Sequence, residues 1–310
     1  MKARVSTDWL AGCSGCHVAV VDLHEKLVGL MDDVEFVRIP VLMDEKGFPQ
    51  ADVGVVEGAV RTAHDREALE KMRKSVKKLV AFGTCAAYGG PSGLGWLYRG
   101  QDVQAHVSTD ANSALPHAQA ARLEDSVVPI AAVVDVDYYL PGCPPHPYFI
   151  AAALRAALGL SAPPLTEKTV CAECTRKMEK RTGGQIKKGS VTVTDPDVCF
   201  LSQGVVCLGS VTLNRCKSPC MAAGAPCVGC AGPSLQVLTE PQLDVRNLLA
   251  RRMSKLCGVE ASAVTSYVEA EAKTFYAFTI ASPLVHQKPT LALREWATAE
   301  PAAAGAGKRG

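Results

Sequence analysis

Short apolar runs alternate with amphipathic segments through the first half of the chain. The apolar runs predict β-strands at residues 3–10, 34–42, 51–58, 77–85 and 131–147. The amphipathic segments predict helices at residues 17–31, 65–76 and 148–159. Strands that alternate with helices in this way are typical of a doubly wound α/β sheet, in which functional groups collect at the carboxyl ends of the strands.

The second half of the chain has a different pattern. The proline-bearing stretch 161–169 predicts a boundary between a domain at 1–160 and a domain at 161–310. Six of the 13 cysteines fall within the 32 residues from Cys199 to Cys230, among glycine, proline and small residues that follow no helical or strand period. A loop of this length needs disulfides, zinc or iron–sulfur clusters to hold it.

Three further segments complete the pattern. Helices are predicted at residues 243–258 and 266–282, and the final stretch 299–310 has the composition of a disordered tail. The polar stretch 91–130 predicts an irregular insert without a nucleotide-binding motif.

Composition narrows the class of protein. The chain has 310 residues, of which 48% are hydrophobic and 21% charged, as expected for a globular protein with a substantial core. A net charge of +2 and an aromatic content of 5% give no indication of nucleic-acid binding. The absence of a signal sequence and of a long apolar run predicts a cytoplasmic protein without a membrane span. Reducing cytoplasm favours metal binding by thiols over disulfides.

Cysteines follow three of the five predicted strands. Cys13 and Cys16 follow the first strand, Cys85 the fourth and Cys143 the fifth. Because the carboxyl ends of parallel strands lie along one edge of a sheet, these four thiolates are predicted to meet and bind one four-iron cluster. Neighbouring glycines would let the backbone approach the sulfur atoms: Gly12, Gly15, Gly83 and Gly142. The alternative of four ordinary buried cysteines does not explain why all four stand at strand ends beside glycine.

Eight of the remaining cysteines make up two further sets of four. They are Cys171, Cys174, Cys199, Cys207, Cys216, Cys220, Cys227 and Cys230, which leaves Cys257 as a plain thiol in a predicted helix. Their spacing is neither a repeat of paired CxxC units, as in zinc ribbons, nor the compact run of bacterial ferredoxins. Spacing alone therefore leaves zinc and iron–sulfur clusters open.

Four motifs resemble those of nickel–iron hydrogenase small subunits. They occur in the order CSGCH, VEGAV, GTCAAYGG and LPGCPPHP. The resemblance implies a flavodoxin-like doubly wound parallel sheet, followed by a loop-rich iron–sulfur domain. It also implies that Cys13, Cys16, Cys85 and Cys143 bind the proximal 4Fe-4S cluster, and that Glu57 lies near it as a candidate catalytic residue. The related subunit of respiratory complex I characteristically has adjacent cysteines, and this chain has none.

The cysteine-rich half continues the resemblance through CFLSQGVVCLGS, TLNRC and CVGCAGP. By this resemblance the distal 4Fe-4S cluster is bound by Cys171, Cys174, Cys199 and Cys207. The medial 4Fe-4S cluster is bound by Cys216, Cys220, Cys227 and Cys230. Many relatives have histidine where this chain has Cys171, and proline near a three-iron cluster where it has Cys220. Both departures point to three 4Fe-4S clusters and to the type of the gamma subunit of methyl-viologen-reducing, deazaflavin-non-reducing hydrogenase.

The implied function is an electron relay in an anaerobic oxidoreductase. Beyond the assigned cysteines the chain has no further pair of CxxC motifs to bind nickel, so a large subunit is expected to cleave H2. Electrons would leave through a further iron–sulfur or flavin subunit, for which a heterodisulfide-reductase-type complex is one candidate. The alternatives are a deazaflavin-reducing hydrogenase or sulfhydrogenase subunit, and a structural zinc-binding assembly protein.

Overall fold

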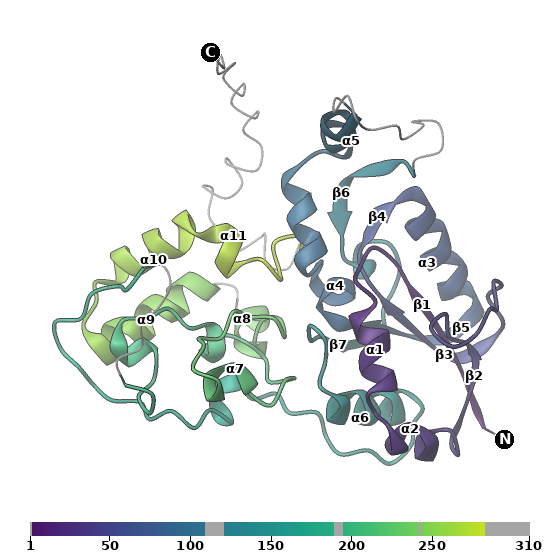
Figure 1. The fold of residues 1–310 in the computed structure, drawn as a ribbon, viewed down its shortest axis with the longest axis horizontal. Helices are drawn as coiled ribbons and strands as arrows, with labels where there is room; N and C mark the ends of the chain where they lie inside the picture. The colour runs from purple at the N-terminus through teal and green to yellow at the C-terminus, as the bar shows by residue number, and fades with distance from the viewer. Residues whose placement is uncertain (1, 109–120, 189–194, 241–242, 283–310) are drawn as a thin grey trace.

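The computed structural model describes residues 2–108, 121–188, 195–240 and 243–282. A parallel sheet with its helices forms one side of the molecule, and a region rich in loops, which begins near residue 170, forms the other (Figure 1). Within the described parts of the chain, no helix combines the length and hydropathy that crossing a membrane requires.

Five parallel strands make up the main sheet, in the spatial order β2-β1-β3-β5-β7. Their bounds are β1 Ala3–Trp9, β2 Val34–Arg38, β3 Ala51–Glu57, β5 Val76–Phe82 and β7 Tyr138–Leu140. Counted within this sheet, the order is 2-1-3-4-5, which is that of a flavodoxin-like doubly wound fold. The α/β fold class predicted from the sequence is therefore confirmed.

Helices cover both faces of this sheet. Successive strand residues point to opposite faces, so Val80 and Phe82 pack in one core while Leu79 and Ala81 pack in the other. The first core is closed by α1 (Gly15–Val21), α2 (Glu25–Leu30) and α6 (Pro147–Ala157). The second core is closed by α3 (Ala63–Ser75) and α4 (Gly83–Tyr88).

The predicted elements differ from the observed ones in four places. The helix predicted at 17–31 divides into α1 and α2, because the backbone turns at His24, whose φ is 50°. The strand predicted at 131–147 shortens to β7, since four prolines follow within residues 141–147. Cys85 lies in the first turn of α4 rather than in a loop. The stretch 91–130 contains a 3-10 helix at Pro91–Leu97, α5 (Gly100–Ser108) and β6 (Leu123–Val128), which pairs with β4 (Val60–Thr62).

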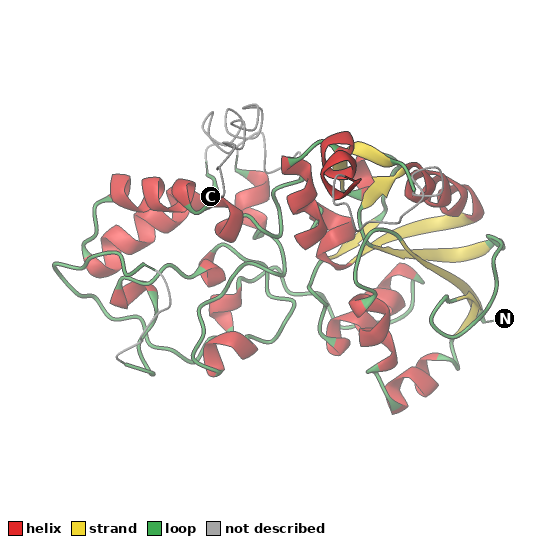
Figure 2. Ribbon diagram, turned by 45° about the horizontal axis from the view of Figure 1, so that its top comes forward, coloured by secondary structure: helices red, strands yellow, loops and turns green. Residues whose placement is uncertain are grey.

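The C-terminal region contains mainly loops and short helices (Figure 2). Its helices are α7 (Pro219–Ala222), α8 (Leu235–Thr239), α9 (Val245–Cys257), α10 (Ala261–Ala270) and α11 (Ala272–Phe275). Helices α10 and α11 replace the single helix predicted at 266–282. A core that includes Phe200, Leu249 and Val264 joins the cysteine-rich loops to α9 and α10. The predicted disordered tail, 299–310, lies outside the described residues.

Candidate metal centres

The register of the sheet places four strand ends in one row. Trp9 of β1 pairs with Glu57 of β3, Glu57 pairs with Phe82 of β5, and Phe82 pairs with Leu140 of β7. Each of these residues is followed within a few positions by a loop or the first turn of a helix. The row therefore brings segments that are far apart in the sequence to one edge of the sheet.

Four cysteines gather at this edge, and we call them the sheet-edge set: Cys13, Cys16, Cys85 and Cys143. Desolvation raises the pKa of Cys143 to about 11, with further contributions from Cys85 and Cys13. Desolvation also raises the pKa of Cys16, and the charges of Glu57, Cys85 and Cys143 raise it further. The mutual influence of the four thiols shows that the structure brings together the residues that the sequence predicted to meet.

Two glycines beside the sheet-edge set leave room for sulfur. Gly83 has a φ of 82°, and a methyl group on it would collide with the Cys16 Sγ atom. Gly90 has a φ of 56°, and a methyl group there would collide with the Cys85 Sγ atom. Both positions therefore require glycine for conformation and for space. Gly83 was predicted from the sequence and Gly90 was missed, although the GTCAAYGG motif contains both.

A buried polar network lies directly behind the sheet-edge set. The Glu57 side chain is almost fully buried, at 3% exposure, and its Oε2 atom accepts a hydrogen bond of 2.9 Å from the backbone N–H of His17. The Nδ1 atom of His17 lies 3.3 Å from the same oxygen, and its Nε2 atom lies 2.9 Å from the Thr7 hydroxyl. The Cys16 thiol donates a hydrogen bond to the Glu57 carboxylate, and this bond also helps to raise the pKa of Cys16. Glu57 is thus buried, and its partner is His17.

Cys171, Cys174, Cys199 and Cys207 form a second group, which we call the outer set. Cys171 is exposed, yet desolvation, followed by the nearby Cys199 and Cys174, raises its pKa to about 11. Cys207 is buried, and a methyl group on Gly209 would lie 3.5 Å from Cys171 Sγ and 3.6 Å from Cys207 Sγ. Two loops that are separated by more than thirty residues of sequence therefore present their thiols to the same small space.

Cys216, Cys220, Cys227 and Cys230 form a third group, which we call the inner set. Desolvation raises the pKa of Cys227 to about 12, and Cys230 and Cys216 contribute to the shift. Desolvation likewise raises the pKa of Cys230 to about 12, with contributions from Cys216 and Cys220. Cys257 is placed elsewhere, in the last turn of α9, where its thiol donates to the Met253 carbonyl at 3.2 Å.

The inner set touches both other sets. The backbone N–H of Cys227 donates to the Cys207 sulfur of the outer set at 3.2 Å. On its other side, Cys230 is near enough to Cys143 of the sheet-edge set for that thiol to raise its pKa. The Thr84 hydroxyl donates to the Cys230 carbonyl at 2.6 Å and accepts from the Gly142 N–H at 2.8 Å. The inner set therefore lies next to each of the other two sets.

The thiols gather, but they do not converge on one point. Among the residues that the structure describes, no three His, Cys, Asp or Glu side chains are placed to hold a single metal ion. A zinc ion draws its sulfur ligands to about 2.3 Å from one centre. Each thiolate of a four-iron cluster binds a different iron, so its four ligands stand further apart. The glycine clearances and the all-thiol donor sets fit iron–sulfur clusters.

Comparison with known proteins agrees with this chemistry. Residues 13–157 match the family described as NADH ubiquinone oxidoreductase, 20 Kd subunit. The chain is 40% identical over 237 residues to a subunit of the vhu F420-non-reducing hydrogenase of Methanocaldococcus jannaschii, covering 75% of this chain and 82% of that protein. It is 32% identical over 301 residues to a subunit of the F420-non-reducing hydrogenase of Methanothermobacter thermautotrophicus, covering 93% of this chain and 97% of that protein.

A solved structure is also similar in part. The chain aligns with a chain of an NAD+-reducing [NiFe]-hydrogenase in the H2-reduced state at 34% identity and a TM-score of 0.47. The alignment covers 53% of this chain and 95% of that chain.

Proposed function

The chain belongs to the family of nickel–iron hydrogenase small subunits of the F420-non-reducing type, and from this we propose how it conducts electrons. It is the iron–sulfur subunit that transfers electrons for a large subunit. We propose that it binds three 4Fe-4S clusters, each of which carries one electron at a time when bound. In this proposal, electrons from H2 oxidation in the large subunit pass through the sheet-edge, inner and outer sets in turn.

The proposed ligand assignment gives each set one cluster. The sheet-edge set would hold the proximal cluster, the inner set the medial cluster and the outer set the distal cluster. The contacts of the inner set carry this assignment, because its members reach both Cys207 and Cys143. An intermediate centre in an electron relay must be close to both of its neighbours, and the inner set meets that requirement.

The protein contributes placement and electrostatics to this relay. Backbone N–H groups at Gly209 and Gly229 donate towards the thiols of Cys207 and Cys227 and oppose the rise in their pKa. The same donors would stabilise the negative charge of sulfur bound to iron and so tune the reduction potential. Cys207 of the outer set and Cys227 of the inner set are buried, which would keep water away from their sulfur atoms. We further propose that residues 1–160 and 161–310 are separate domains, joined at 161–169.

Electrons would leave the subunit from the outer set. Cys171 is exposed, and the loop that follows it displays Lys177, Lys180 and Met178, the last with 72% of its surface exposed. A basic rim around an exposed apolar side chain suits docking of a partner with an acidic surface. We propose that this partner is an iron–sulfur or flavin subunit, such as one of a heterodisulfide-reductase-type complex, and that the assembly works in the cytoplasm.

Iron analysis tests the number and assignment of the clusters. The anaerobically purified wild-type subunit, in complex with its large subunit, should contain about 12 iron atoms in this chain, four for each set. Cys220→Ser should remove or convert the inner cluster alone, which EPR spectroscopy would report. Cys257→Ser is the matched control and should leave the iron content and all three signals unchanged.

Three results would contradict the proposal. If the wild-type chain contained only about eight iron atoms, it would bind two clusters and not three, since each cluster has four iron atoms. Loss of the outer signal in Cys220→Ser, with the inner signal intact, would overturn the division of the eight C-terminal cysteines. Zinc in place of iron and acid-labile sulfide would instead identify a structural zinc protein.

A further inference from the structure

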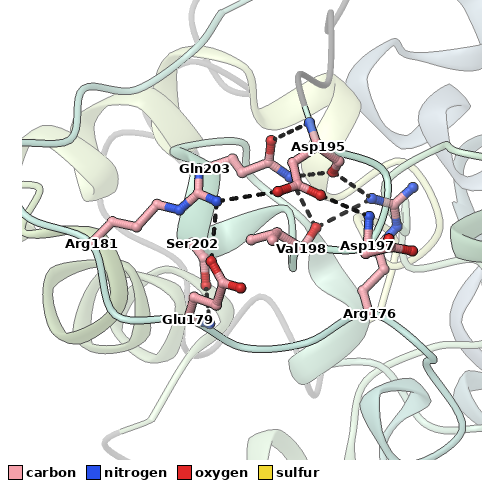
Figure 3. Close-up of polar contacts among 8 residues, drawn as sticks. All are labelled: Arg176, Glu179, Arg181, Asp195, Asp197, Val198, Ser202 and Gln203. Atoms are coloured by element: carbon pink, nitrogen blue, oxygen red, sulfur yellow. Dashed lines mark hydrogen bonds and ion pairs between the residues drawn. The ribbon is translucent and has the colours of Figure 1, made fainter.

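Arg176 donates hydrogen bonds to two other segments of the C-terminal region, and its contacts with the segment at 195–198 are drawn in Figure 3. Its Nη1 atom donates to the Val198 carbonyl at 3.2 Å and to the Asp195 carbonyl at 3.4 Å. Its Nε atom donates to the Met221 carbonyl at 3.2 Å. One guanidinium group thus joins its own segment to the loop at 195–198 and to the start of helix α7.

Each of these segments carries a cysteine of the outer or inner set. Val198 precedes Cys199, Met221 follows Cys220, and Arg176 lies two residues after Cys174. Two of these cysteines belong to the outer set, and Cys220 belongs to the inner set. Arg176 is therefore bonded to backbone within two residues of ligands proposed for two different clusters.

The guanidinium group is held in a fixed plane. Its central carbon lies 4.1 Å from the centre of the Phe200 ring, and Phe200 is completely buried. Gln203 donates to the same two carbonyls as Arg176, those of Asp195 and Val198, at 2.9 Å each. Backbone hydrogen bonds from Lys177 to Asp197, at 2.7 Å, and from Cys199 to Lys177, at 2.8 Å, align the two outer-set segments. The loop at 195–198 is consequently fixed from both sides.

A neighbouring arginine in the same network provides a contrast. Arg181 pairs with the carboxylates of Glu179 at 3.1 Å and Asp195 at 3.5 Å, and its side chain is 39% exposed. Such surface ion pairs contribute little to stability. The hydrogen-bond partners of Arg176 are neutral backbone carbonyls, so these contacts order the loops without neutralising its charge.

We propose that Arg176 is a positioning residue that sets the separation and orientation of the inner and outer clusters, an inference that rests on the proposed function of both sets. In the step concerned, the inner centre loses one electron and the outer centre gains it, and the electron originates in H2 oxidation. The rate of such a transfer falls steeply with distance, so a small displacement of either loop slows it.

Lysine cannot replace arginine at this position. Arginine presents a planar fork that spans separated carbonyls and stacks on an aromatic ring, whereas the lysine ammonium is a compact point charge on a flexible stem. Arg176→Lys should therefore retain the positive charge and lose the clamp between loops. Arg176→Met removes both, so the two variants separate geometry from electrostatics.

The test uses the anaerobically purified complex of small and large subunits. Both Arg176 variants should alter the EPR spin–spin interaction between the reduced inner and outer clusters. Both should also slow reduction of the outer cluster after H2 addition several-fold. Of the two Arg176 variants, only Arg176→Met should lower the reduction potential of the outer cluster, because Arg176→Lys keeps the positive charge. Arg181→Met is the control and should match the wild type in spin–spin interaction and rate.

Iron content and the signals of the wild-type complex also test the role of Arg176. Selective loss of about four iron atoms from the outer set in either variant would support the clamp. Wild-type spin–spin interaction and rate in both variants, or loss of all three clusters with general unfolding in both, would overturn it. If the wild-type complex itself lacked the inner or outer signal, the proposed function would fail, and the variants alone could not produce that result.

Discussion

At the scale of single residues, Glu57 and His17 form a buried contact beside the sheet-edge set. The sequence placed Glu57 at a strand end beside the cysteines, and the motif in which it stands indicated its neighbourhood. Neither its burial nor its contact with His17 could be predicted, because both depend on the register that pairs β3 with β1 and β5. The requirement for glycine at position 90 could not be predicted either, because only the folded loop shows that a side chain there would collide with the Cys85 sulfur.

Glu57→Gln should raise the reduction potential of the cluster at the sheet-edge set. The change removes a negative charge that acts on Cys16, and a less negative surrounding favours the reduced cluster. An EPR-monitored redox titration of the complex measures this shift. Glu35→Gln, the same substitution at an exposed position of β2, should leave the potential unchanged. A potential in Glu57→Gln equal to that of the wild type would show that this carboxyl group does not influence the cluster.

At the scale of elements, periodicity predicted most strands and helices of the sheet but misjudged their ends. Cys85 was expected in a loop and lies in α4, because a six-residue helix is too short to show a period. The pairing of β4 with β6 joins segments more than sixty residues apart, which local patterns do not reveal. The loops of the C-terminal region were predicted as loops, whereas their contacts depend on side chains such as Arg176.

His24→Gly should stabilise the break between α1 and α2. His24 has a φ of 50° and a ψ of −126°, a conformation that side chains with a Cβ rarely adopt and that costs about 1–3 kcal/mol. Glycine relieves this strain, although its greater chain entropy in the unfolded state costs about 0.5–1 kcal/mol of stability. The free energy of unfolding should therefore rise. The midpoint of thermal unfolding of the complex should rise, whereas His24→Ala, which keeps the Cβ, should give no rise. An unchanged or lower midpoint in His24→Gly would contradict the strained turn.

At the scale of the whole molecule, the sequence indicated which cysteines belong together but not how the three sets are arranged. Their order in space follows from a few contacts between distant segments, such as Thr84 with Cys230 and Cys227 with Cys207. These contacts join the parallel sheet to the loop-rich region and bring the inner set next to each of the other two. In the proposed function, electrons would pass between the three groups of thiols along these contacts.

Anomalous X-ray diffraction at the iron edge, on anaerobic crystals of the small and large subunits together, tests this arrangement most directly. We predict three iron centres in this chain, with the middle one bound by Cys216, Cys220, Cys227 and Cys230. Two centres, or a middle centre bound by cysteines of the outer set, would contradict this prediction.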